Sequence, residues 1–151
     1  MKLATLYSQL SHWPLGRWIF SHIITFKAPY FSSICPIIQE LTETKCVVTF
    51  KKRRHVQNHI GTMHAIAMCN ACELAFGMTM EAGIAKNLRW IPKGMTVRYL
   101  KKGETDLTAI CDFPVVTSMI PGDYIVPVKV LDRNSHIVME ADISVYVSEK
   151  Q

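Results

Sequence analysis

The stretch that decides the fold runs from residue 62 to residue 80 and reads TMHAIAMCNACELAFGMTM. Apolar and small residues fall on every side of such a helix, and its only ionisable side chains besides cysteine are His64 and Glu73. A helix that is apolar all round is buried on every side or spans a membrane. Because Glu73 lies near its centre, with Asn70 and His64 on the same segment, we expect a helix buried in a protein core.

The segments after residue 83 alternate apolar and polar residues with a period of two, as strands do when one face meets a core. Three such strands cover residues 95–99, 124–130 and 137–147. Turn-forming residues at 102–104, 121–123 and 132–135 are expected to join them as an antiparallel meander. A sheet with one apolar face needs a cover, and the 62–80 helix is the available partner.

Two further strands are predicted before the helix, at 34–41 and 46–54, from their β-branched and aromatic residues. The polar stretch 42–45 separates them, and Pro36 weakens the first prediction because proline has no N–H for a strand ladder. Together these elements predict an α+β fold, an antiparallel sheet around one long buried helix.

The N-terminal region contains a further helical pattern. Four apolar residues follow Pro14 at three- and four-residue spacing: Leu15, Trp18, Ile19 and Ile23. Proline favours the first turn of a helix, so a short amphipathic helix is predicted here. We expect it to pack on the domain, and the alternative is that it lies on a membrane surface. Without an internal repeat or linker, residues 1–151 are predicted to form one domain, with 1–30 as a helical extension.

The composition is that of a globular protein: 151 residues, of which 49% are hydrophobic and 19% charged. The net charge of +5 is concentrated in the cluster 51–54 and in Lys101 and Lys102. Two local clusters suit a phosphorylated ligand better than a long polyanion, so no nucleic-acid partner is predicted. Nucleic acid, and a solvated strand end for the 51–54 cluster, are the alternatives.

The five cysteines are an odd number, and three of them lie inside apolar stretches, where a thiol behaves as a small apolar group. Cysteines that pack as free thiols predict that the protein resides in the reducing cytoplasm. The N-terminus reaches Ser8, Gln9, His12 and Arg17 before any apolar run of signal length. We therefore expect no secretion signal and no stable membrane insertion.

A short motif, NHIGTMH at 58–64, precedes the helix. An asparagine is followed by a glycine three residues later, a histidine six later and an acid fifteen later: Asn58, Gly61, His64 and Glu73. This pattern resembles the active-site signature of the hotdog-fold acyl-CoA thioesterases, in particular their phenylacetyl-CoA thioesterase-like branch. The element order from Met63 onward is similar to theirs, and the N-terminal helix and the stretch 89–95 resemble an uncharacterised bacterial hotdog subgroup. The resemblance implies a hotdog fold and hydrolysis of an acyl-CoA to free acid and CoA.

The start of the helix supplies backbone groups suited to acyl transfer. Thr62 is expected to cap the helix, and the first N–H groups after a cap have no partner inside the helix. They point, with the positive end of the helix dipole, at a thioester carbonyl that becomes an oxyanion. The resemblance implies that Ala65 N–H is the donor, with Asn58, His64 and Glu73 as the other catalytic residues.

Substrate-binding residues are expected around this helix start and at basic positions downstream. The CoA phosphates are expected at Lys93 or at Lys101 and Lys102, and the acyl chain along the buried helix. The members near the helix start are Gly61, Thr62, Ile66 and Asn70. No metal and no cofactor are predicted, apart from coenzyme A as part of the substrate.

Glu73 lies eight residues after Ala65. This spacing is about 12 Å along the helix axis at roughly 1.5 Å per residue, too far for both groups to act on one carbonyl. The working partner of Glu73 is therefore expected in another subunit, as the resemblance also implies. We predict at least a homodimer, with a tetramer left open, since the edges of the meander also need cover.

Each motif residue also has a purely structural interpretation. Asn58 can stabilise its loop, Gly61 can be present for its backbone freedom, and His64 can be a satisfied histidine at a helix start. A carboxylate in a buried helix is costly unless it is paired, protonated or used. A structural ion pair is therefore the alternative to catalysis for Glu73.

The sequence departs from the thioesterase pattern at two places. The family has Gly-Gly after the histidine, where this chain has Ala65 and Ile66, and the larger side chain narrows the approach to the helix start. This favours, as the alternative function, a non-catalytic module that binds acyl-CoA or a fatty-acyl group. The family also carries a hydroxyl on the next strand, where this chain has Pro92, with Thr96 the nearest substitute. A dehydratase that uses the histidine and the glutamate as acid and base is a third possibility.

Five residues of types that bind metals lie close together in the sequence: His55, His59, His64, Cys69 and Cys72. The two cysteines lie within the helical pattern, without a second pair or a ligand-rich loop. We therefore predict that they pack as small thiols and bind no metal.

Overall fold

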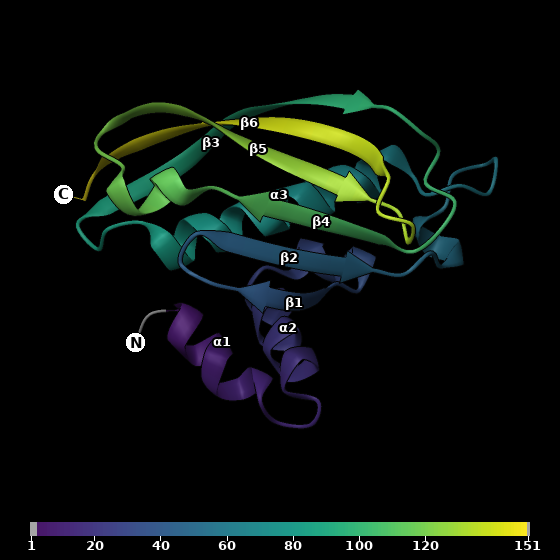
Figure 1. Cartoon of the computed structure of the whole chain (residues 1–151), viewed down its shortest axis with the longest axis horizontal. Coiled ribbons are helices and arrows are strands. Elements are labelled where there is room, and N and C mark those ends of the chain that lie inside the picture. Colours follow the sequence, from purple (N-terminus) through teal and green to yellow (C-terminus); the bar gives the residue numbers. More distant parts are fainter. Residues whose placement is uncertain (1–2, 151) are drawn as a thin grey trace.

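One antiparallel sheet curves around a single long helix (Figure 1). The computed structural model describes residues 3–150. Its strands are β1 Ile37–Leu41, β2 Lys45–Phe50, β3 Leu88–Tyr99, β4 Leu107–Asp112, β5 Gly122–Leu131 and β6 Ile137–Glu149. They form one six-stranded sheet in the order β1-β2-β4-β5-β6-β3, and the enclosed helix is α3, Ala65–Gly83. The predicted α+β architecture is confirmed.

Two helices precede the sheet, α1 Leu3–Ser11 and α2 Gly16–Lys27. They form a hairpin that extends from the β1 side of the sheet (Figure 1), and the start of α1 also lies beside the end of α3. Three short 3₁₀ segments complete the fold: η1 Pro29–Ile34, η2 Arg54–Val56 and η3 Pro114–Ser118.

The predicted meander is wrong in one respect, because β3 does not pair with the strand that follows it. β4 was not predicted; it pairs with β2 and β5, whereas β3 pairs with β6 at the far edge of the sheet. Residues 100–106 join β3 to β4, and this connection is longer than a hairpin loop of about two to five residues. It therefore crosses the sheet instead of reversing the chain beside β3.

The first two strands are shorter than predicted. Ile34 ends η1, and Cys35 takes a left-handed conformation, so β1 begins only at Ile37 after Pro36. β2 ends at Phe50, because the basic residues after it lead into η2.

The core lies between α3 and the concave face of the sheet. Among its largest fully buried side chains are Phe76, Leu74 and Met80 of α3, and Val48, Met139 and Ile143 of the strands. The alternation predicted for the last strand is confirmed from Met139 onward, since the alternate positions 139–147 are buried while Glu140, Asp142 and Ser144 are half-buried on the other face.

The expectation that α3 is buried on every side is wrong for the single chain. Ile66 is 56% exposed, Glu73 is also exposed, and Cys69 and Gly77 are half-buried along the same stripe of the helix. The sheet covers the other sides of α3, but this stripe lies open between η1 and β3, which contact it through Asn70 and Cys69. We call this stripe, Ile66 to Gly77, the open strip.

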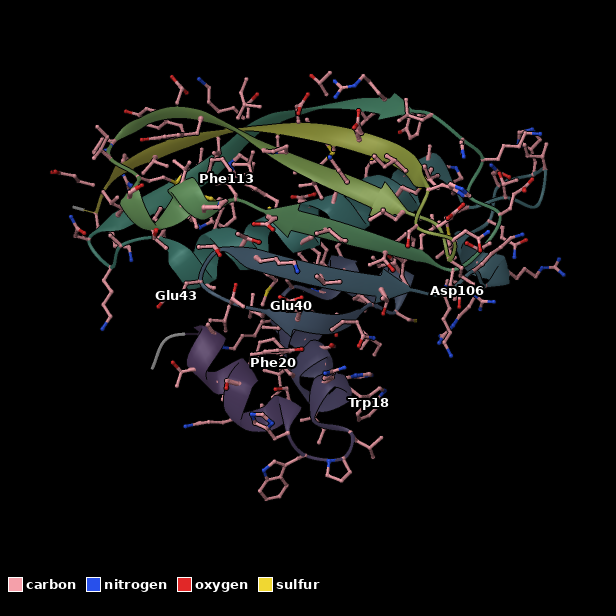
Figure 2. The ribbon with its side chains drawn as sticks, in the orientation of Figure 1. Trp18, Phe20, Glu40, Glu43, Asp106 and Phe113 are labelled. Atoms are coloured by element: carbon pink, nitrogen blue, oxygen red, sulfur yellow. The ribbon has the colours of Figure 1, made fainter. Side chains whose placement is uncertain are left out.

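The predicted packing face of the N-terminal helix is also wrong. Leu15, Trp18, Ile19 and Ile23 are all exposed, whereas Gly16, Phe20 and Ser21 are buried. The helix begins at Gly16, whose backbone lies so close to the carbonyl of Leu10 in α1 that a β-carbon there would collide with it. This contact sets the rotation of α2 and turns Phe20 inward, while Trp18 points outward (Figure 2).

Candidate active site

The start of α3 is capped by His64, so the prediction that Thr62 caps it is wrong. His64 Nδ1 accepts a hydrogen bond from Ile66 N–H at 3.1 Å. Met63 N–H donates to Gly103 O at 2.7 Å and His64 N–H donates to Val56 O at 2.8 Å. These two bonds hold the residues before the helix in an extended segment, which is why the helix starts three residues later than predicted.

Asn58 and Thr62 instead close the loop that leads to the helix. Asn58 Nδ2 donates to Thr62 Oγ1 at 2.8 Å, and Asn58 Oδ1 accepts from the N–H groups of Thr62 and Ile60 at 3.0 and 3.2 Å. Gly61 has a φ of 76°, a conformation that favours glycine. Asn58 and Gly61 therefore determine the shape of the loop that leads to the start of α3.

The first backbone groups of α3 differ in what they contact. Ile66 N–H is taken by His64, and Ala67 N–H donates to the His64 carbonyl at 3.0 Å. Ala65 N–H forms no hydrogen bond with any of residues 3–150. This N–H, at the positive end of the helix dipole, is the one free to bind an anionic or carbonyl oxygen.

A cavity of about 170 Å³ lies at the start of α3, between the helix, η1 and η2. Its polar lining residues are Tyr30, Ser33, His55, Gln57, His64 and Asn70. Sequence reasoning missed Tyr30, Ser33 and Gln57, because nothing local relates them to a helix that lies far along the chain.

Asn70 is the most informative residue of this cavity. Its Nδ2 donates to Ser33 Oγ at 3.0 Å and to Tyr30 O at 3.5 Å. Its Oδ1 is buried and has no hydrogen-bond partner among residues 3–150. An unpaired buried acceptor costs about 1–3 kcal/mol, so this oxygen is an acceptor that a ligand N–H or O–H would satisfy.

Along the open strip, α3 faces the inner side of β3. Cys69 Sγ lies 3.3 Å from the Tyr99 hydroxyl at the end of β3. Partial burial, and then the neighbouring Cys69 thiol, raise the pKa of Tyr99 to about 12. Met95 and Val97 of β3 are half-buried on the same side. Thr96 is exposed on the opposite side of the strand. It therefore does not supply the hydroxyl that the thioesterase pattern carries on the strand after the helix.

Glu73 lies on the open strip and is exposed. None of the ion pairs among residues 3–150 includes it. The expectation that Glu73 is buried, and therefore costly unless paired, is wrong for the single chain. The alternative of a structural ion pair within one subunit is wrong as well. Eight residues of helix, about 12 Å at roughly 1.5 Å per residue, separate Glu73 from Ala65 along the helix axis.

The predicted basic residues fall into two places. Lys101 and Lys102 precede Gly103, whose carbonyl accepts from Met63 N–H, so they lie beside the loop that leads to α3. Lys93 lies in the first half of β3, and its Nζ forms an ion pair with Oδ1 of Asp123 at 3.0 Å. The structure thus brings Lys101 and Lys102 near the helix start, but not Lys93.

The cysteine pair of α3 is divided between surface and core. Cys72 is buried, and burial raises the pKa of its thiol well above the usual range, while Cys69 lies on the open strip. Metal ligation needs the thiolate, which burial disfavours. Within residues 3–150, no three histidine, cysteine or acidic side chains converge as metal ligands.

A curved antiparallel sheet wrapped around one long helix defines a hotdog-fold protein. The chain belongs to the family described as a domain of unknown function, DUF4442, whose sequence profile matches residues 16–147. No protein of the curated set matches the sequence significantly. Over residues 3–150, no helix is both long enough and apolar enough to cross a membrane.

Several solved structures are similar to this chain. One, a crystal structure of a genomics target, is 42% identical, with a TM-score of 0.87 over 98% of this chain and 99% of that one. A protein of unknown function from Pseudomonas aeruginosa, described as a probable thioesterase, is 16% identical, with a TM-score of 0.78 over 86% and 93% of the two chains. A thioesterase from Haemophilus influenzae is 9% identical, with a TM-score of 0.70 over 80% and 82%. The hotdog fold expected from the sequence is confirmed.

Proposed function

We propose that this protein hydrolyses an acyl-CoA thioester to the free acid and CoA. The observation that carries the proposal is the open strip of α3, with the unpaired Ala65 N–H at one end and the unpaired carboxylate of Glu73 two turns along. Acyl transfer needs a donor for the developing oxyanion and a base or nucleophile for the carbonyl carbon. The thioesterase descriptions of the hotdog relatives in Pseudomonas aeruginosa and Haemophilus influenzae support the same chemistry.

The complete site is proposed to need two copies of the chain. Glu73 and Ala65 of one copy are too far apart to act on one carbonyl, and the strip between them is uncovered. β3 lies at the edge of the sheet, paired only with β6, and a long edge strand is usually covered. A second copy laid against β3 and the open strip would bring its Glu73 toward the helix start of the first.

In the proposed mechanism the thioester oxygen binds Ala65 N–H, where the helix dipole stabilises the negative charge of the tetrahedral intermediate. Glu73 of the second copy removes a proton from the attacking water, or attacks the carbonyl carbon itself to form an anhydride that water then hydrolyses. In either route the C–S bond breaks as the tetrahedral intermediate collapses, and the CoA thiolate leaves and takes up a proton. His64 accepts from Ile66 N–H through Nδ1, so its neutral ring carries the proton on Nε2. That N–H is then a second donor at the mouth of the site.

The CoA moiety is proposed to bind through three residues near the helix start. Lys101 and Lys102 supply the positive charge for its phosphates, since Lys93 is already engaged by Asp123. Asn70 Oδ1 offers the missing acceptor for an amide N–H of the pantetheine arm. The acyl chain would follow the open strip past Ile66, Met95 and Val97.

A specific observation favours a second candidate function. Ile66 is 56% exposed at the helix start, where the thioesterase pattern has a glycine. A branched side chain there narrows the approach of a thioester carbonyl to Ala65 N–H, whereas an acyl chain can still lie against the apolar side chain of Ile66 on the open strip. The alternative is therefore a module that binds acyl-CoA or a fatty-acyl group without turnover.

The test is the release of free thiol from a panel of acyl-CoAs of increasing chain length, followed with a thiol reagent. Hydrolysis should exceed the buffer rate and depend on chain length. Tight binding by calorimetry without thiol release would favour the binding module, and neither binding nor release from any acyl-CoA would remove both functions.

A further inference from the structure

The hairpin of α1 and α2 presents an apolar surface to solvent at the β1 side of the molecule. It is made of Trp13 and Leu15 in the turn and Trp18, Ile19, Ile23 and Phe26 on the outer side of α2. Trp13 is 72% exposed and Phe26 is 88% exposed. We call this set the N-terminal apolar face. Figure 1 shows the hairpin extending from the β1 side of the sheet, and the least exposed member of the face, Ile23, is still 39% exposed.

This exposure does not come from a loosely placed helix. α2 is attached to the sheet through its opposite side, where Ser21 Oγ accepts from Ile38 N–H at 2.9 Å. Tyr7 of α1 donates to Ile38 O at 3.2 Å and packs edge-on against the buried ring of Phe20. The inner side of α2 is therefore occupied by these contacts. A rotation of α2 that buried the outer residues would expose Phe20 and break the hydrogen bonds to Ile38.

The charged side chains of the two helices that carry the N-terminal apolar face have one sign. The acids beside the hairpin come from other elements: Glu40 of β1 pairs with Lys45 at 3.0 Å, and Glu81 of α3 lines a cavity with Lys27. Residues 1–39 contain no aspartate or glutamate, whereas Arg17 and Lys27 lie on α2 itself. A groove of about 490 Å³ runs beside α2, and Trp18 and His22 line it together with Lys51 and Arg53 from the segment after β2. The basic cluster at 51–54 therefore borders the aromatic residues, although it is far from them in the sequence.

We propose that the N-terminal apolar face docks on the surface of a lipid bilayer with anionic headgroups. Tryptophan and phenylalanine side chains bury their rings at the boundary of headgroups and acyl chains, and neighbouring cations bind the phosphates. Each lysine or arginine near such a surface is worth roughly a fivefold gain in affinity. The helix lies along the surface and does not cross it.

The charges favour this occupant over a second copy of the chain. Two copies joined through this face would bring Lys51 and Arg53 of each copy together, and the helices that carry the face supply no acid to neutralise them. Like charges across an interface oppose association, whereas an anionic bilayer compensates them. The face also lies on the β1 side of the sheet, away from β3 and its unpaired edge.

Vesicle binding tests the proposal, with the full chain sedimented against vesicles of phosphatidylglycerol or of phosphatidylcholine. The protein should bind the anionic vesicles, bind the neutral ones much less, and dissociate as salt is added. Trp13 and Trp18 fluorescence should shift to shorter wavelength on binding; the third tryptophan, Trp90, packs on Phe76 and should change little. Absence of binding to phosphatidylglycerol at low salt would overturn the proposal.

Matched variants test whether vesicle binding depends on the N-terminal apolar face or on exposed apolar residues anywhere on the molecule. Trp13→Ser and Phe26→Ser should each weaken vesicle binding by about tenfold or more, since each removes an aromatic ring from the buried area. Ile120→Ser is the control, because Ile120 is 69% exposed in the loop before β5, away from the hairpin. Lys51→Gln with Arg53→Gln should weaken binding to the anionic vesicles only. Equal losses for Ile120→Ser, or a Phe26→Ser variant that changes the oligomeric mass but not vesicle binding, would contradict docking on lipid.

Discussion

At the scale of single residues, the chemistry of the proposed site depends on groups that the chain itself leaves unpaired. Glu73, Ala65 N–H and Asn70 Oδ1 have no partner among residues 3–150. Asn70 Oδ1 is the buried member of this set, and a buried acceptor without a partner is unusual unless a ligand or another chain completes it. The first two predictions concern two of these residues.

Glu73→Gln should abolish most of the activity without affecting the fold. The change removes the negative charge but keeps the shape, and an exposed side chain without an ion pair contributes little to stability. Turnover of acyl-CoA should fall by about two to four orders of magnitude, while the melting temperature and acyl-CoA affinity stay unchanged. Glu81→Gln is the control on the same helix, because Glu81 accepts from Trp90 Nε1 and glutamine keeps that acceptor. Wild-type turnover in Glu73→Gln would exclude this residue from the reaction.

Asn70→Ala should weaken substrate binding more than it weakens the fold. The change removes the hydrogen bond to Ser33, which lowers the free energy of unfolding. It also removes the unpaired Oδ1, which raises the free energy of unfolding, so the two effects oppose each other. Acyl-CoA affinity, measured by calorimetry, should fall by roughly tenfold through loss of the ligand's hydrogen bond. Ser33→Ala is the control, because it removes the same internal bond and keeps Oδ1. If both variants bind equally well, Asn70 does not contact the ligand.

At the scale of elements, the orientation of α2 depends on one close approach between backbones. Gly16→Ala should destabilise the protein by about 1–3 kcal/mol, because the added methyl group meets the Leu10 carbonyl and pushes α1 and α2 apart. The free energy of unfolding in denaturant measures this loss. Gly94→Ala is the matched control, since a β-carbon at Gly94 meets no atom within 4 Å. An unchanged Gly16→Ala protein would mean that other contacts set the rotation of α2.

At the scale of the whole molecule, the proposed site requires an assembly. Light scattering should give about twice the chain mass of 17.2 kDa or more. Ala65→Pro removes the proposed oxyanion donor alone, because proline is accepted at the first helical position and His64 before it is already extended, with ψ 138°.

Mixed dimers then decide whether the site is shared. Ala65→Pro and Glu73→Gln should each be inactive, but subunits mixed by refolding should regain about a quarter of the wild-type activity, because half of the dimers hold one intact site. If both residues acted within one chain, every site in the mixture would carry a defect. In that case no activity would return, and the shared site would be wrong.

Much of the fold could be predicted because its signals are local. The apolar run at 62–80 predicts α3, and the period-two pattern at 137–147 predicts β6, since each pattern lies within one element. The motif at 58–64 predicted that a helix begins directly after it, and α3 begins at Ala65. β4 was missed because its buried positions, Leu107, Ala109 and Cys111, mix a large residue with two small ones in a short strand.

Sequence patterns were therefore enough to predict α2, α3 and five of the six strands, the hotdog class, and the loop before α3, but not α1 or β4. Only the tertiary structure decided the pairing of β3 with β6, the contact of Asn70 with Ser33, and the side of α2 that faces solvent. The apolar residues of α2 lie on both its faces, so spacing could not choose between them, and the approach of Gly16 to Leu10 made the choice. Contacts between residues distant in the chain depend on the packing of whole elements, which no local pattern records.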